Sequence, residues 1–87
     1  MLFISEYSIQ PENRNAVQNR FKTGAAGPPE AVKMIGRWHS AAGGRGVTVF
    51  ETDDPQALAS WAQQWSDLIR FEIYPAIDDA GLAKLLG

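Results

Sequence analysis

Residues 61–75 read Trp61-Ala-Gln-Gln-Trp65-Ser-Asp-Leu68-Ile-Arg-Phe71-Glu-Ile-Tyr74-Pro75, and this stretch decides the fold. Its first half places two tryptophans one turn apart on the same side of a predicted helix. Its second half has the alternation of a half-buried β-strand. A helix that runs almost directly into a strand gives this short chain a large apolar surface to cover.

The chain has 87 residues, which predicts a single domain over residues 1–87. A chain of this size buries only about 60–65% of the surface that its unfolded form exposes, so the core is thin. It has no cysteine and one histidine, His39. Disulfides, iron–sulfur clusters and thiolate zinc sites are therefore excluded, and we expect a second copy of the chain to act as the stabiliser.

The net charge is −2, and the lysines and arginines form no run or stripe. We expect no nucleic-acid partner, because proteins that bind nucleic acids carry a basic footprint. The N-terminus lacks the basic and apolar regions of a signal peptide, and no segment is long enough for a membrane span. These features predict a cytoplasmic protein that has no membrane partner.

Periodicity and turn signals divide the chain into strands and helices. We expect strands at 2–8, 31–40, 46–52 and 71–77, helices at 11–22 and 55–68, and a short C-terminal helix at 82–86. Gly43 and Gly44 suit a hairpin between the second and third strands. The order β-α-β-β-α-β predicts a ferredoxin-like α+β domain, with a four-stranded antiparallel sheet and two helices on one face.

Strand parity sorts the side chains of this sheet into two faces. An aliphatic set is expected to pack under the helices: Leu2, Ile4, Met34, Val47, Val49, Phe71 and Ile73. The opposite set is mixed but rich in aromatic residues: Phe3, Ser5, Tyr7, Ile35, Arg37, His39, Thr48, Phe50, Glu72 and Tyr74. An open face of this kind would expose a large apolar patch, so we predict a homodimer that pairs these faces. A bulge would invert part of either set.

His39 is the candidate catalytic residue, because its side chain titrates near neutral pH without perturbation. Together with Trp38, Arg37, Tyr7 and Tyr74 it forms the candidate ligand-binding set. In this hypothesis His39 transfers a proton, Arg37 anchors a negative charge and Trp38 walls the pocket. The simpler interpretation is that His39 is a partly exposed residue near a hairpin.

Two other groups of residues have a structural as well as a functional explanation. Trp61 and Trp65 could wall a ligand cavity, but their helical spacing favours a place in the core. The acidic pairs 53–54 and 78–79 could hold a cation, but each stands where a helix begins, and helix capping explains both. We therefore expect no metal and no cofactor.

Four short blocks resemble a small uncharacterised family whose members are described only as domains of unknown function. They are Gly36-x-Trp38, Glu51-Thr-Asp-Asp-Pro55, Trp61-x3-Trp65-Ser-Asp67-Leu68 and Phe71-Glu-x-x-Pro75, and the resemblance covers residues 2–77. That family is similar to the dimeric α+β-barrel superfamily, in which two ferredoxin-like subunits close their sheets into a shared barrel. The superfamily includes cofactor-free monooxygenases, lactone isomerases and haem enzymes. The resemblance therefore implies a fold and a dimer, leaves the activity open and carries over no catalytic residue.

Two classes of function remain. The first is an enzyme or binding protein that takes a small organic molecule without a cofactor. The second is a non-catalytic dimeric module that regulates or assembles with another protein. A closed cavity that touches His39 and Trp38 would favour the first class, whereas a solid interior with His39 in solvent would count against it.

Overall fold

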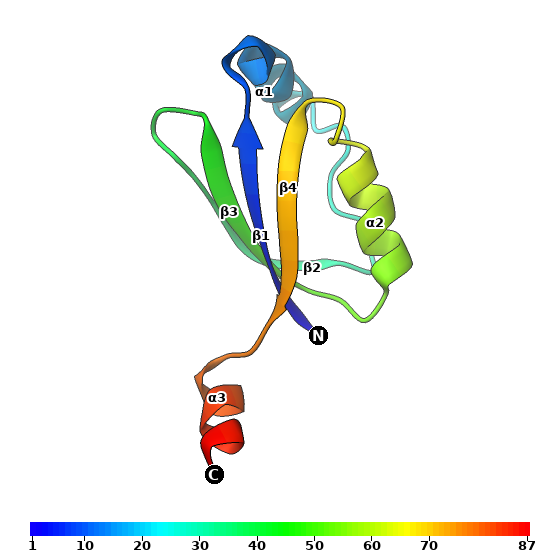
Figure 1. Ribbon diagram of the computed structural model, residues 1–87. Helices are drawn as coiled ribbons and strands as arrows, with labels where there is room; N and C mark the ends of the chain where they lie inside the picture. Colours follow the sequence, from blue (N-terminus) through cyan, green and yellow to red (C-terminus); the bar gives the residue numbers. More distant parts are fainter.

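The computed structural model describes residues 1–87. The elements are β1 (Leu2–Ile9), a 3₁₀ turn (Pro11–Asn13), α1 (Arg14–Lys22), β2 (Lys33–His39), β3 (Arg45–Glu51), α2 (Pro55–Gln63), β4 (Ile69–Ala76) and α3 (Asp79–Leu86). All strands pair antiparallel in one sheet of order β2-β3-β1-β4. The predicted ferredoxin-like α+β fold is confirmed, with α1 and α2 beside the sheet and α3 beyond it (Figure 1).

Two aspartates start helices, as the sequence predicts. The Asp54 side chain accepts a hydrogen bond from the backbone N–H of Ala57 at 3.0 Å and caps α2. Asp78 caps α3 in the same way, by accepting from the N–H of Gly81 at 2.8 Å. These bonds satisfy N–H groups that have no partner within a helix. Asp53 instead forms an ion pair with the N-terminal amine at 2.7 Å.

The predicted helix at 55–68 is too long, because α2 ends at Gln63 and residues 64–68 form turns. The N–H of Trp65 bonds to the carbonyl oxygen three residues earlier, at 3.1 Å, so the chain winds more tightly here than in an α-helix. The indole N–H of Trp65 donates to the carbonyl oxygen of Ala26 at 2.8 Å, and that of Trp61 donates to the same oxygen at 3.1 Å. The two tryptophans therefore hold the loop between α1 and β2 against α2.

The prediction of which sheet face packs under the helices is wrong for β1 and β3. Phe50 is fully buried, and it packs with Leu58 and Val32 and against Phe3 and Trp61. Cross-strand partners share a face, so the sheet residues on the helix side are Phe3, Ser5, Tyr7, Thr48 and Phe50, whereas Leu2, Ile4, Val47 and Val49 lie on the open face. The large aromatic side chains fill the space between the sheet and the helices. The smaller aliphatic side chains would leave part of that space empty. The prediction for β4 holds, since Phe71 and Ile73 line the helix side.

A bulge in β2 changes the direction of its side chains. Met34 pairs with Phe50, but the next pair is Gly36 with Val49, so Ile35 is the extra residue. Met34 and Arg37 therefore share the helix face although their positions have opposite parity. Trp38 lies on the open face, 59% exposed.

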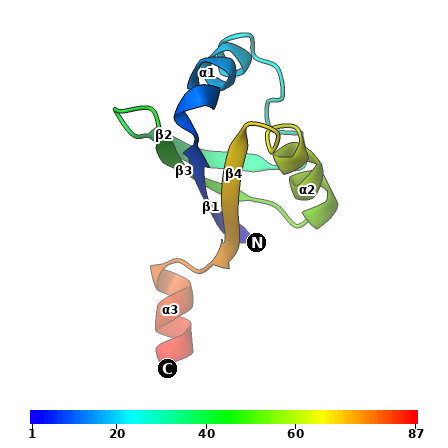
Figure 2. The ribbon, with the colours of Figure 1, turned by 45° about the horizontal axis from the view of Figure 1, so that its top comes forward.

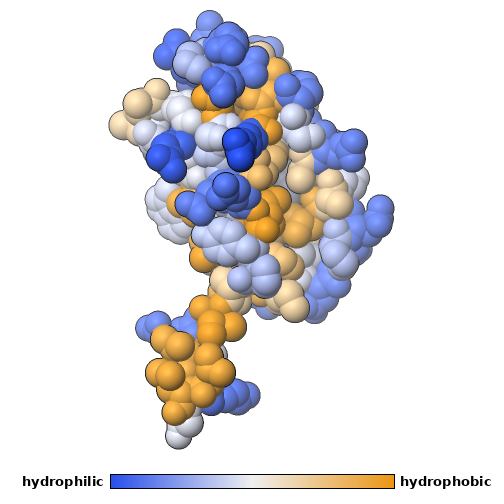
Figure 3. Space-filling model, viewed as in Figure 1, coloured by the Kyte–Doolittle hydropathy of each residue, from blue (hydrophilic) through white to orange (hydrophobic).

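Helix α3 extends away from the sheet beyond the end of β4 in both ribbon views (Figures 1 and 2). It begins earlier than predicted, at Asp79. Its leucines Leu82, Leu85 and Leu86 are exposed, and they form an apolar surface that lies apart from the rest of the molecule (Figure 3). No other part of the chain covers this surface.

Candidate ligand-binding site

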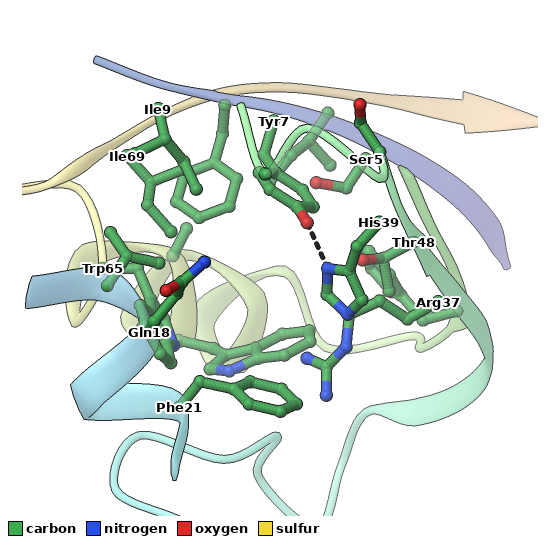
Figure 4. Close-up of a pocket in the computed structure, with 18 of the residues that line it drawn as sticks. Ser5, Tyr7, Ile9, Gln18, Phe21, Arg37, His39, Thr48, Trp65 and Ile69 are labelled. Atoms are coloured by element: carbon green, nitrogen blue, oxygen red, sulfur yellow. Dashed lines mark hydrogen bonds between the residues drawn. The ribbon is translucent and has the colours of Figure 1, made fainter. Parts of the chain in front are cut away.

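A cavity of about 310 Å³ lies between the sheet and the helices. Every strand contributes to its wall, together with α1 and α2, and the lining is mainly apolar and aromatic (Figure 4). The volume falls at the lower end of the range of about 300–1,000 Å³ that is typical of small-molecule sites. The space between the sheet and the helices, which is partly open to solvent, could therefore hold a compact organic molecule.

Tyr7, Gly46 and His39 lie side by side on β1, β3 and β2, in one row across the sheet. A Cβ at Gly46 would collide with the ring and hydroxyl of Tyr7 and with the carbonyl oxygen of Trp38. Because Gly46 has no side chain, the Tyr7 ring lies across β3 and its hydroxyl forms a hydrogen bond with Nδ1 of His39 (Figure 4). Sequence reasoning missed Gly46, although a glycine inside a strand is itself a signal of close approach.

Phe21 and Arg37 complete the polar end of the cavity. The guanidinium of Arg37 lies 4.8 Å from the centre of the Phe21 ring, within the range of a cation–π contact. Phe21 also packs edge-on against His39, with ring centres 5.7 Å apart. Phe21 is 50% exposed and borders the cavity. Its place is therefore at the site and not in the core.

The surroundings set the protonation states of His39 and Tyr7. His39 is exposed near the hairpin, but its partial desolvation lowers its pKa, and the charge of Arg37 lowers the pKa further. Burial raises the pKa of Tyr7, and Arg37 opposes part of this rise. At neutral pH the imidazole is therefore neutral and the phenol is protonated. When Nδ1–H donates to the Tyr7 oxygen, the lone pair of Nε2 is free to accept a proton.

The structure brings together three of the five predicted ligand-binding residues, Tyr7, Arg37 and His39, at one cavity. Trp38 and Tyr74 do not line this cavity, although Trp38 borders a second, shallower groove together with Tyr7 and His39. The bulge in β2 leaves Trp38 on the open face beside Val47. The hydroxyl of Tyr74 donates to Oε2 of Glu6 on that face, at 2.9 Å, and this bond raises the pKa of Tyr74.

Trp61 and Trp65 serve both of the roles that the sequence left open. Trp61 packs edge-on against Phe50, with ring centres 5.8 Å apart, and only 9% of the surface of Trp65 is exposed. Both indoles also line the cavity. The core of this small domain and the wall of its cavity are therefore made of the same side chains.

The charges around the cavity are unequal. Arg37 is its one permanent cation, and no carboxylate lines it. Its three titratable side chains gather at one end, whereas the opposite end is formed by Ile9, Ile69 and Trp65 (Figure 4). Such a site suits a molecule with an apolar ring and one acidic group.

The fold and the cavity define the class of protein: a small ferredoxin-like α+β domain with an aromatic-lined cavity between sheet and helices. The chain belongs to the family described as domain of unknown function DUF3303, whose model matches residues 1–87. Among solved structures it is similar to Rv0793 from Mycobacterium tuberculosis, with a TM-score of 0.52 and 16% identity, over 91% of this chain and 96% of that chain. At this identity the likeness concerns the fold alone. No curated protein matches the chain. None of its helices has the length and apolar character that crossing a bilayer demands.

Proposed function

We propose that this protein is a homodimer whose subunits each bind a small, planar organic molecule with a weakly acidic hydroxyl group, such as a phenol or an enol. The supporting observation is an apolar cavity that has Tyr7, Arg37 and His39 at one end and no carboxylate in its wall. A carboxylate would repel the anion of such a ligand, whereas the fixed charge of Arg37 stabilises it.

The size and walls of the cavity suggest the shape of the ligand. Its volume of about 310 Å³ equals that of roughly ten water molecules in the liquid, which suits a molecule of one or two rings. Phe21, Phe50, Trp61 and Trp65 offer aromatic faces and edges against which a flat ring can pack. The ring would occupy the apolar end, and its hydroxyl would point toward His39.

His39 is the proposed base. Nδ1–H donates to Tyr7, Nε2 accepts the hydroxyl proton, and the electron pair of the broken O–H bond stays on the ligand oxygen. Arg37 then faces the anion. This transfer needs no cofactor, because both the proton and its acceptor are already in the cavity. Tyr7 acts as a positioning residue that fixes the ring of His39.

Binding of para-nitrophenol tests this function, because the anion of this probe is coloured and the neutral form is not. At a pH just below the pKa of the free probe, the protein should increase the coloured fraction. A lost charge-assisted hydrogen bond costs about 1.5–3 kcal/mol, so Arg37→Gln and His39→Gln should each weaken binding about 10- to 100-fold.

The two tyrosines provide a matched pair of variants. Tyr7→Phe removes a hydroxyl inside the cavity, and Tyr74→Phe removes one on the open face. Only the first should reduce the coloured fraction of para-nitrophenol. Equal effects of the two changes would refute the assignment of the site. A protein that leaves the spectrum of the probe unchanged would instead support the non-catalytic dimeric module.

The homodimer has a separate basis in the open sheet face. Leu2, Ile4, Val47 and Val49 lie there half-buried, beside the exposed Trp38. A second sheet packed on this face would remove apolar surface from water. Light scattering at micromolar concentration should give about twice the chain mass of 9.5 kDa. A soluble monomer at that concentration would refute this part of the proposal.

A further inference from the structure

The C-terminal arm, residues 77–86, consists of α3 and the two residues before it. Its four large apolar side chains are exposed: Ile77 by 62%, Leu82 by 45%, Leu85 by 74% and Leu86 by 77%. Figure 3 displays them as a separate apolar surface. A helix of eight residues is marginal in water when it stands alone. The arm therefore needs a surface on which to pack.

The sequence of the arm specifies a helix with two different sides. Asp78 caps it, and Leu82, Leu85 and Leu86 recur at the spacing that lines one side of a helix. Lys84 points to the opposite side, about 200° around the axis from Leu82 at 100° per residue. Asp79, in the first turn, flanks the leucine side. The arm thus presents an apolar stripe with a negative charge at its N-terminal end.

The open face of the sheet offers a matching surface. A shallow groove beside β2 and β3 is lined by Glu6, Trp38, Arg45 and Val47 of the open face and also by Tyr7, His39, Ser40 and Gly46. Trp38 and Val47 supply apolar surface, and Arg45 lies two residues along β3 from Val47, about 7 Å away. On the arm, Asp79 precedes Leu82 by three residues, a rise of about 4.5 Å. A leucine over Trp38 would therefore place Asp79 within reach of Arg45.

The arm does not contact this groove in its own chain. It follows Ala76, which shares a row of the sheet with Leu2, whereas Trp38 is in the row of Glu6. The two rows are four residues apart, or about 13 Å, and β4 and β2 are opposite edges separated by three strand spacings of about 4.8 Å each. The arm also points away from the sheet (Figures 1 and 2). In this arrangement the surface that covers the arm belongs to another molecule.

We propose that the arm packs into the Trp38 groove of a second copy of this chain. In a two-fold symmetric dimer, each chain would then place its arm in the groove of the other chain, so that both grooves are filled. Each arm buries about 150–300 Å² of its own apolar surface when Ile77 and the three leucines are covered. Two arms and the partner surfaces that they cover together bury roughly 600–1,200 Å². With the area buried between the open faces, the total reaches that of a stable protein–protein interface. An unrelated partner would cover the arm and leave the groove open.

The dimer dissociation constant, measured by sedimentation, tests the arm in the full chain and its variants. A chain that ends at Asp78 should dimerise about 100-fold more weakly, and its circular dichroism should show an intact sheet, because α3 lies away from it. Lys84→Ser, on the opposite side of α3, is the matched control and should leave the constant unchanged. Unchanged dimerisation of the shortened chain would overturn the proposal while leaving the sheet-paired dimer intact.

Reversal of the charges at Asp79 and Arg45 gives an independent test of where the arm binds. Asp79→Arg should weaken the dimer, and the double change Asp79→Arg with Arg45→Asp should restore it. Since the chain has no cysteine, Leu85→Cys chains can also be mixed with Trp38→Cys chains. Oxidation should then join one chain of each kind. A double variant that instead forms its disulfide within a monomer would show that the arm folds back, and would refute exchange.

Discussion

One oxygen atom, the carbonyl of Ala26, accepts hydrogen bonds from the indoles of both Trp61 and Trp65. Replacement of either tryptophan by phenylalanine keeps an aromatic ring and removes one donor. Each single change should cost about 0.5–1.5 kcal/mol for the lost hydrogen bond, because the oxygen retains its other partner, and a further amount for the lost packing of the larger indole ring. The double change leaves this half-buried oxygen with neither donor. We expect it to cost about 1 kcal/mol more than the sum of the single changes.

Urea unfolding followed by far-ultraviolet circular dichroism measures these costs without relying on tryptophan fluorescence. All variants should be compared at one protein concentration, because dimerisation adds to the apparent stability. For a domain of this size, 1 kcal/mol corresponds to about 4–8 °C in melting temperature, so the coupling is readily measured. Strictly additive costs would refute the reasoning, since they would mean that water or another donor replaces the indoles at no cost.

Three further predictions follow from the site and the surface. Because folding lowers the pKa of His39, the unfolded chain binds more protons, so the melting temperature should fall from about pH 7 to pH 5, and His39→Gln should reduce that fall. Gly46→Ala should cost about 1–3 kcal/mol and weaken para-nitrophenol binding, whereas Gly44→Ala should be neutral, because its Cβ would meet no atom within 4 Å. The hydrogen bond from Arg20 lowers the pKa of Asp67, so stability should decline as the pH falls below about 4, and Asp67→Asn should remove that part of the decline in acid melting curves.

The element order could be predicted from the sequence because local signals carry it. Asp54 and Pro55 mark the start of α2, and Asp78 marks the start of α3. The alternation of residues 46–52 marks a strand. The end of α2 could not be predicted in this way. Trp65 continues the helical spacing of Trp61, and its indole bonds to Ala26, 39 residues away, a contact that local sequence does not reveal.

The faces of the sheet were harder to predict, because parity groups side chains without saying which group faces the helices. Tyr7, Arg37 and His39 were correctly placed together, but on the wrong side of the sheet. Hydrophobicity favours the aliphatic set for the interior, whereas the distance to the helices favours the larger aromatic rings. Tyr74 was assigned to the same group because the register of β4 on β1 cannot be deduced from either strand alone, and a shift of one residue exchanges the faces.

Because the predicted and observed faces of the sheet are reversed for β1 and β3, the ligand site and the dimer surface lie on opposite sides of the sheet. The aromatic residues that suggested a dimer line the cavity, and the surfaces that need a partner are the open face and the arm. Yet Trp38 and His39 are neighbours on β2, one on each face. β2 is an edge strand with a bulge, and within one chain β3 is the only strand that pairs with its backbone. A partner that packs on Trp38 would hold β2 in place and with it the imidazole of His39. Dilution below the dimer dissociation constant should therefore weaken para-nitrophenol binding, although no residue of the partner enters the cavity.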